Sequence, residues 1–119
     1  MVRFKLTDME TKFANIIWEN EPIESPNLVK LCEQQLSWKK STTYTMLRRI
    51  SEKGIFENRK GTVYSLIKKE DFYSMQSQEY INEVFQGSLP RFFTAFTRGK
   101  KLSNKEINEL QTLINEHKE

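Results

Sequence analysis

The chain has 119 residues, enough for one domain or for a small domain with an assembly segment, and 37% of them are hydrophobic against 29% charged. Eight Phe, four Tyr and two Trp argue against disorder, while the single cysteine excludes an internal disulfide and a multi-cysteine metal site. The formal net charge is +3. No apolar run approaches the ~18 residues of a membrane-spanning helix, and the N-terminus is too charged for a signal peptide. We therefore expect a cytoplasmic protein.

The first predicted helix has a capping box at its start. Thr7 and Glu10 have the spacing at which two side chains satisfy the free N–H groups of the first helical turn. The helix should end before Pro22, because the residue that precedes a proline is pushed toward extended geometry. Its predicted apolar face consists of Met9, Phe13, Ile16 and Ile17.

A short extended link over residues 22–24 leads to the second predicted helix. Ser25 is the expected N-cap and Pro26 the first helical residue, where no N–H is needed. The apolar stripe of this helix consists of Leu28, Val29, Cys32 and Leu36. At this spacing we expect Cys32 to be a small core residue rather than a reactive thiol.

The third predicted helix covers residues 41–54, STTYTMLRRISEKG, and Gly54 is placed to close it. Its apolar face consists of Thr43, Met46, Leu47 and Ile50. The opposite face carries Ser41, Thr45, Arg48 and Glu52, with Thr42, Tyr44 and Arg49 on its flanks. Residues 38–69 hold nine Lys/Arg against two acidic residues, a local charge of +7. On charge alone, this segment is either a nucleic-acid footprint or a solvated basic face.

Two β-prone segments, residues 55–58 and 62–67, flank Arg59-Lys60-Gly61 and predict a hairpin with a basic tip. Three helices followed by a hairpin form the winged helix-turn-helix arrangement, in which the last helix enters the major groove and the hairpin touches the DNA backbone. The predicted fold class is therefore mainly α with a small β-hairpin. Residues 1–69 are the predicted winged-helix DNA-binding domain.

Residues 70–119 predict three more amphipathic helices. The first ends at Gly87 and has an apolar stripe of Tyr73, Tyr80, Ile81, Val84 and Phe85. Ser88 caps the second, which ends at Gly99, and Ser103 opens the third with Glu106 as its capping-box partner. Their apolar surface exceeds what a small winged domain covers, so we expect a helical dimerisation domain. The predicted interface anchors are Tyr80, Val84, Phe85, Leu89, Phe92, Phe93, Phe96, Leu110 and Ile114.

Four stretches, taken in chain order, carry a resemblance to a known family: LTDMETKFANIIWENEP, SPNLVKL, STTYTMLRRISEKGIF and LSNKEINELQTLI. They resemble the BlaI/MecI/CopY transcriptional repressors, which control penicillinase, methicillin-resistance and copper-responsive genes. The resemblance implies a homodimer that binds a pseudo-palindromic operator in double-stranded DNA and blocks transcription.

The same resemblance implies how repression is relieved. One branch of the family is cut in its dimerisation region by a membrane-bound sensor metalloprotease, and the copper branch exchanges metals at C-terminal cysteine pairs. This chain has no C-terminal cysteine, and His117 alone makes no metal site, so we expect no metal and no cofactor. The family's scissile Asn-Phe bond matches Ala95-Phe96, which keeps only the phenylalanine, so Phe96 is either a cleavage position or a core residue.

The predicted DNA contacts fall into two groups. Those expected to bind phosphate are Ser25 at a helix start and the cations Lys39, Lys40, Arg48, Arg49, Arg59 and Lys60. Those expected to read bases are Ser41, Thr42, Tyr44 and Thr45. A winged-helix regulator that responds to a small molecule and a winged-helix protein-interaction module remain alternatives. The sequence has no phosphate-binding loop and no group of residues typical of a catalytic nucleophile, so we do not expect an enzyme.

Overall fold

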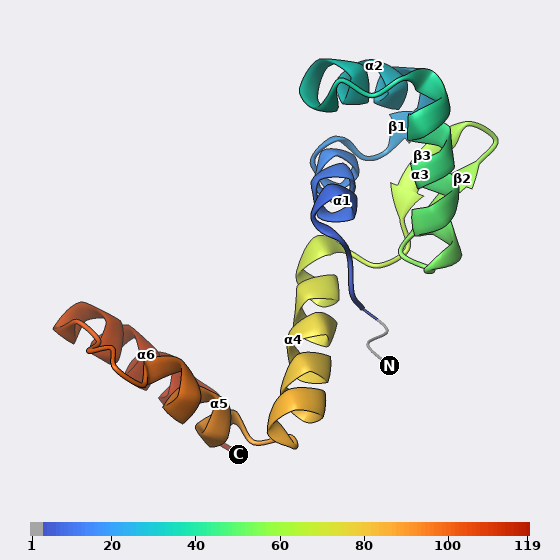
Figure 1. Ribbon diagram of the computed structural model, residues 1–119. Helices are drawn as coiled ribbons and strands as arrows, with labels where there is room; N and C mark the ends of the chain where they lie inside the picture. Colours follow the sequence, from blue (N-terminus) through green and yellow to red (C-terminus); the bar gives the residue numbers. More distant parts are fainter. Residues whose placement is uncertain (1–3) are drawn as a thin grey trace. The chain divides into compact units, whose positions relative to one another are not determined.

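The computed structural model describes residues 4–119 (Figure 1). The chain divides into two compact units, with the boundary after Tyr80. The elements in chain order are α1 (Asp8–Asn20), β1 (Ile23–Glu24), α2 (Ser25–Leu36), α3 (Lys40–Glu52), β2 (Phe56–Arg59), β3 (Thr62–Ser65), α4 (Lys69–Phe85), α5 (Leu89–Thr97) and α6 (Asn104–Glu116). Within the described range, none of these helices has the length and apolarity needed to cross a membrane.

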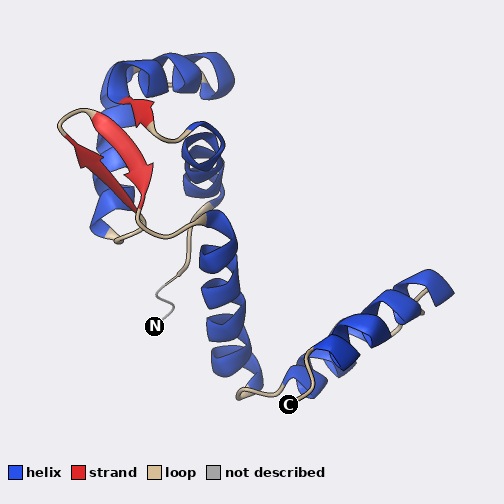
Figure 2. Cartoon of the chain, turned by 180° about the vertical axis from the view of Figure 1, so that it is seen from behind, coloured by secondary structure: helices blue, strands red, loops and turns tan. Residues whose placement is uncertain are grey.

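The strands of the first unit form one small antiparallel sheet in the order β1-β3-β2 (Figure 2). Val63 at the centre pairs with Ile23 on one side and Asn58 on the other. Lys60 and Gly61 both have positive φ, 52° and 90°, as the favoured two-residue hairpin turns require. The predicted hairpin is therefore confirmed, and the short link before α2 forms a third strand beside it.

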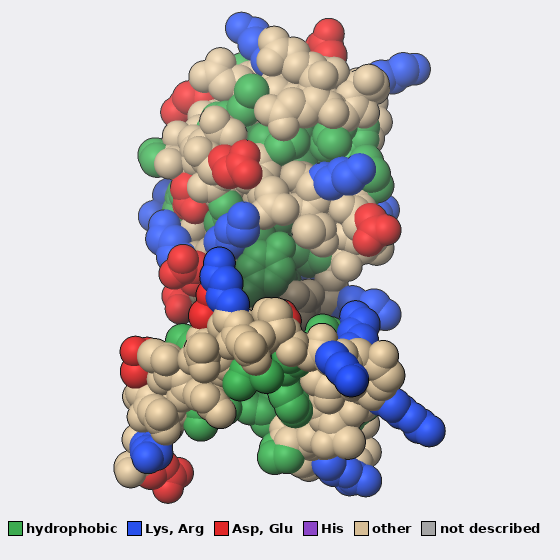
Figure 3. Space-filling view, turned by 90° about the vertical axis from the view of Figure 1, so that its left-hand side faces the viewer, with side chains coloured by type: hydrophobic (Ala, Val, Ile, Leu, Met, Phe, Trp, Pro, Cys, Tyr) green, Lys and Arg blue, Asp and Glu red, His purple; other side chains and the backbone are tan. Residues whose placement is uncertain are grey.

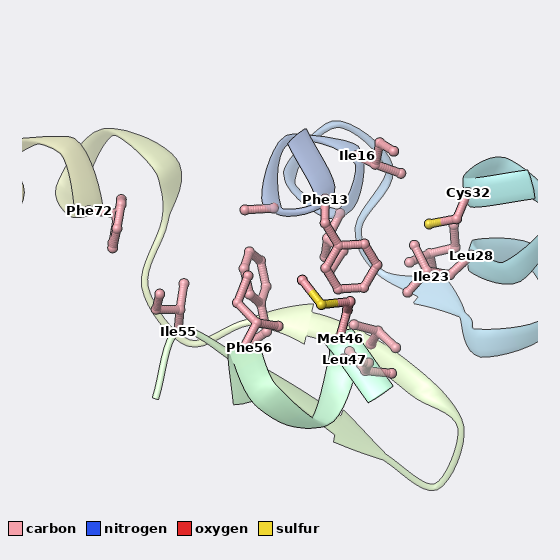
Figure 4. Close-up of a cluster of buried hydrophobic side chains, with 14 residues drawn as sticks. Phe13, Ile16, Ile23, Leu28, Cys32, Met46, Leu47, Ile55, Phe56 and Phe72 are labelled. Atoms are coloured by element: carbon pink, nitrogen blue, oxygen red, sulfur yellow. The ribbon is translucent and has the colours of Figure 1, made fainter. Parts of the chain in front are cut away.

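The core of the first unit lies between α1, α2, α3 and the sheet (Figure 4). It consists of Phe13, Ala14, Ile16, Ile17, Ile23, Leu28, Cys32, Met46, Leu47, Ile50, Ile55, Phe56, Val63 and Phe72. The apolar face predicted for the third helix is confirmed, because all four of its members are buried. Cys32 is fully buried, and this burial raises the pKa of its thiol, as suits a core residue.

Two expectations for the first helices are wrong. Met9 is 40% exposed, whereas its neighbour Glu10 is almost fully buried. Burial alone would raise the pKa of Glu10, but its bonds from the Thr7 N–H at 2.9 Å and from the Lys53 ammonium at 3.0 Å outweigh burial and lower the pKa. The second error concerns Ser25, which is the first residue of α2 rather than its cap; Glu24 stands at the N-cap and makes no side-chain cap bond.

The start of α4 is part of the first unit's core. Phe72, which the predicted stripe of this helix leaves out, is 1% exposed and contacts the Trp18 ring at a centroid distance of 5.6 Å. The Trp18 indole N–H donates to the Ile67 carbonyl at 3.1 Å and holds the turn that precedes α4. The first turns of α4 are thereby fixed to α1 and the sheet.

The second unit, Ile81–Glu119, has no buried residue. Its predicted helices form, but α4 and α5 end two residues before Gly87 and Gly99, and of the predicted capping box of α6 only the bond to Ser103 is present. Ser88 caps α5 and Ser103 caps α6, each accepting the N–H of the residue three positions later. The rings of Phe85, Phe92 and Phe96 form a row with centroid distances of 5.5 and 5.8 Å. Several hydrophobic side chains of this unit are exposed. The space-filling view shows hydrophobic side chains at the surface, next to polar and charged ones (Figure 3).

Candidate nucleic-acid interface

The two faces of α3 separate apolar from polar side chains. Its inner face lies in the core, and the predicted outer residues Ser41, Thr42, Thr45, Arg48 and Arg49 are all exposed. Hydroxyl, methyl and guanidinium groups on one exposed helical face are the groups that contact base edges and phosphates. The outer face of α3 therefore has the chemistry of a recognition helix.

Two lysines at the start of α3 extend this polar face. Lys40 is the first residue of the helix and Lys39 its N-cap, so the helix begins one residue before the predicted stretch. Both side chains are exposed, as is Lys60 at the tip of the hairpin. Among the described residues, none pairs ionically with Lys39, Lys40, Lys60, Arg48 or Arg49. These five cations therefore have no competing ion pair among the described residues.

Ser25 and Tyr44 bond to each other. The Tyr44 hydroxyl donates to Ser25 Oγ at 3.1 Å, and the Ser25 N–H donates to the Gly61 carbonyl at 2.7 Å. These bonds join the recognition helix, the start of α2 and the hairpin turn, and they bury Ser25. The DNA contacts predicted for Ser25 and Tyr44 stay predictions, while the structure gives both side chains an internal role.

The hairpin has an acidic residue that the predicted site does not include. The Arg59 guanidinium lies 3.3 Å from the Glu57 carboxylate and 5.8 Å from the Tyr64 ring centroid, and the Tyr64 hydroxyl donates to Glu57. That bond lowers the pKa of Glu57 and raises the pKa of Tyr64. Because Glu57 and Arg59 are two positions apart on β2, they share one face of the strand, and this period could have revealed the pair.

An open groove of about 600 Å³ separates the end of α3 from β2. Leu47, Phe56 and Leu66 give it apolar walls. Arg48 on one side and Glu52 and Glu57 nearby place both signs of charge at its rim. In the described part of the chain, no three His, Cys, Asp or Glu side chains gather in a way that could hold a metal ion.

The dipeptide matched to the family's cleavage position lies on α5. Ala95 and Phe96 are exposed, and Lys100 Nζ lies 5.1 Å from the centroid of the Phe96 ring. His117 stands at the C-cap of α6, where its Nδ1 lies 2.7 Å from the Leu113 carbonyl oxygen. Ala95, Phe96 and His117 therefore all lie at exposed positions of the C-terminal unit.

A recognition helix with a free polar face, packed on two helices and followed by a basic-tipped hairpin, defines a winged-helix DNA-binding protein. The family model described as "Penicillinase repressor" matches residues 6–116. The chain belongs to the penicillinase repressor (BlaI/MecI) family, and it is a DNA-binding transcriptional repressor that acts on operator DNA and not an enzyme.

Curated relatives match nearly end to end. The methicillin resistance regulatory protein MecI of Staphylococcus aureus strain Mu50 is 28% identical over 116 residues, which cover 94% of each chain. The penicillinase repressor of Bacillus licheniformis is 29% identical over 118 residues, which cover 96% of this chain and 92% of the relative. The penicillinase repressor of Staphylococcus aureus is 26% identical and covers 90% of this chain and 88% of its own.

Proposed function

We propose that this repressor is a homodimer that binds the two halves of a pseudo-palindromic operator through α3 and the hairpin. The observation that carries the DNA-binding part is the free polar face of α3, with Arg48 and Arg49 exposed on a helix whose other face is buried. The two residue groups predicted from the sequence supply complementary parts of the contact. Cations bind phosphates and set affinity, and the hydroxyl side chains near the helix start discriminate bases.

The dimerisation domain that we propose is the segment predicted from the sequence, residues 70–119, although its first residues up to Tyr80 belong to the first unit and its exposed apolar surface lies mainly in Ile81–Glu119. Its support is the exposure of large apolar side chains: Val84, Leu89, Phe93, Phe96, Leu113 and Ile114 are each between 44% and 64% exposed. Burial of such side chains in a second copy removes apolar surface from water, which is the main driving force of obligate association. Dimerisation then fixes the distance between two recognition helices, and this distance must match successive turns of one groove.

Relief by proteolysis is the third part of the proposal, with a membrane-bound sensor metalloprotease as the partner. A cut between Ala95 and Phe96 would separate Phe96 and all of α6 from the rest of the apolar surface. The two halves of the interface would then no longer be on one chain, and the dimer and its paired recognition helices would be lost.

The DNA-binding part is tested with Arg48→Ala in a gel shift at several salt concentrations. The probe is the duplex that the wild-type chain selects from random DNA. We expect about tenfold weaker binding, a salt slope reduced by about 1, and an unchanged melting temperature. Lys12→Ala on α1 is the control, because it removes the same charge from a partly exposed position outside the proposed interface. Loss of stability with unchanged binding would give Arg48 a structural role instead.

Sedimentation at micromolar concentration tests the dimer directly. We expect a single species of twice the 14.2 kDa chain mass. A monomer at this concentration would contradict the homodimer, whatever the outcome of the DNA-binding experiment.

A further inference from the structure

The N-terminal arm, residues 4–6, lies along one face of α4. The Phe4 N–H donates to the Glu79 carboxylate at 2.9 Å, and the Gln76 side-chain amide donates to the Phe4 carbonyl at 2.9 Å. The Phe4 ring meets the edge of Phe72 at a centroid distance of 6.0 Å. Phe72, Gln76 and Glu79 follow one another at helical spacings of four and three residues, so they share one face of the helix.

The other end of the arm is bound to the end of the recognition helix. Lys53, the C-cap of α3, donates from its ammonium to the Lys5 carbonyl at 3.1 Å and to Glu10 at 3.0 Å. Leu6 packs against the core, and Thr7 caps α1. The arm thus makes contacts with α1, the end of α3 and two turns of α4.

Phe72 and Tyr73 hold the first turn of α4 against Trp18, at ring centroid distances of 5.6 and 6.1 Å. A helix held at one turn only can still pivot about that turn. Gln76 and Glu79 extend the attachment by two further turns, up to the residue before Tyr80. Both bonds use the backbone of one arm residue, and both side chains are partly buried. This geometry specifies where residues 69–80 of α4 lie relative to the recognition helix.

We propose that the arm contact, formed by the Phe4 backbone with Gln76 and Glu79, is a positioning device that sets which half-site spacing the repressor accepts. The inference rests on the proposed function, since α4 leads from the DNA-reading unit into the proposed dimerisation domain. Residues 69–80 held in one position relative to α3 limit the directions in which the chain leaves the DNA-reading unit. An operator whose spacing requires another direction can then be bound only if the arm contact breaks. Gln76 and Glu79 act through the position of α4 and not through contact with DNA.

The test uses the full-length wild-type chain and its Gln76→Ala/Glu79→Ala double variant. The probes are the two-half-site duplex that the wild type selects from random DNA, versions with one or two base pairs added to or removed from its centre, and a single half-site duplex. We expect the wild type to prefer one spacing. In the double variant this preference should fall by at least about fivefold, the factor that one hydrogen bond contributes, with single half-site affinity unchanged.

Matched variants separate the arm contact from general effects on α4. Glu79→Gln keeps an oxygen that can accept the Phe4 N–H, so it should retain the wild-type spacing preference, whereas Glu79→Ala should not. Gln78→Ala removes an amide whose one bond to a described residue is to Ser74 within α4, and it should also behave as the wild type. Hydrogen exchange at the Phe4 amide should accelerate in Glu79→Ala and not in Gln78→Ala.

Each contrary result has a definite meaning. An unchanged spacing preference in the double variant, with faster exchange at Phe4, overturns the inference and leaves the dimeric repressor intact. Unchanged exchange at Phe4 in Glu79→Ala shows that the contact is not formed in solution and also overturns it. If the double variant loses the same affinity for the single half-site duplex as for the two-half-site duplex, Gln76 and Glu79 stabilise the fold of the DNA-binding unit itself. This result also overturns the inference. If the wild type shows no preference for any spacing, both this inference and the proposed binding of two half-sites by a dimer are contradicted.

Discussion

The two units of this chain differ in what their helices bury. Among its described residues, the first unit buries fourteen apolar side chains between three helices, a sheet and the start of α4, whereas Ile81–Glu119 buries none. Both units have capped helices with amphipathic sequences, so local helix signals do not distinguish them. The difference is in packing: α1, α2 and α3 each find apolar partners within the chain, and α5 and α6 leave large apolar side chains in water.

This comparison separates two sources of stability. Burial of apolar surface stabilises the first unit within one chain, at about 25 cal/mol per Å² removed from water. Isolated helices of 9 and 13 residues, the lengths of α5 and α6, are marginal in water without tertiary packing. The second unit is therefore expected to gain most of its stability from association, and the predictions below test that contrast.

The largest effect is expected from Phe56→Ala in the first unit. Phe56 is fully buried and its ring contacts Trp18 at a centroid distance of 5.2 Å. The substitution leaves a cavity in a packed core and should lower the free energy of unfolding by about 3–5 kcal/mol. Urea unfolding followed by tryptophan fluorescence measures it. Phe93→Ala, at a 44% exposed position, should leave the unfolding of the first unit nearly unchanged.

Phe93→Asp should weaken association of the second unit while it leaves the free energy of unfolding of the first unit nearly unchanged. A carboxylate in an apolar interface is left without a partner, so the dimer dissociation constant should rise by at least about thirtyfold, equivalent to about 2 kcal/mol. Sedimentation over a concentration series measures the change. Phe93→Leu keeps an apolar side chain and should stay within a few fold of the wild type. Equal dissociation constants for Phe93→Asp and the wild type would show that α5 lies outside the interface.

A third prediction concerns acid and the first unit. Burial alone would raise the pKa of Glu21, but the Ser65 hydroxyl at 2.6 Å, the Ser65 N–H at 2.7 Å and the Lys68 ammonium outweigh it, so the folded-state pKa lies below the ordinary 4.5. A lowered folded-state pKa means that the carboxylate stabilises the fold above pH 4.5 and that this stability is lost as the pH falls through the folded-state value.

Glu21→Gln isolates this contribution. At pH 7 it should cost about 1–2 kcal/mol, because the bonds from Ser65 and Lys68 lose their charged acceptor. The difference in unfolding free energy from the wild type should shrink as the pH falls below 4.5. Unfolding curves at pH 7, 5, 4 and 3 test this, and a difference that stays constant over that series would contradict it.

The smallest effect is expected at the hairpin, where Glu57 pairs with Arg59, a cation that we propose binds DNA phosphate. Glu57→Gln should strengthen DNA binding about two- to threefold, because an exposed ion pair is weak and its loss frees one cation for phosphate. Repeating the substitution in an Arg59→Ala background completes a double-mutant cycle. If Glu57 acts through Arg59, the gain should be smaller in that background. An equal gain would make it a general effect of net charge.

Much of the DNA-reading unit could be predicted from local patterns. The spacing of Thr43, Met46, Leu47 and Ile50 defined the buried face of α3, because a helix repeats every 3.6 residues whatever it packs against. The hairpin followed from a short glycine-containing turn between two β-prone segments, and the structure gives Lys60 and Gly61 of that turn the positive φ of a two-residue hairpin. The motifs shared with the penicillinase repressors indicated the family, and the comparisons confirmed it.

The sequence by itself therefore determined the elements, the exposed face of α3 and the family. Only the tertiary structure decided which polar groups meet: Glu10 with Lys53, Ser25 with Tyr44, and the Phe4 backbone with Gln76 and Glu79. The physical reason is range. A capping box or an apolar stripe is formed by residues a few positions apart, whereas these contacts join residues separated by 19 to 75 positions, and their partners are set by how the helices pack.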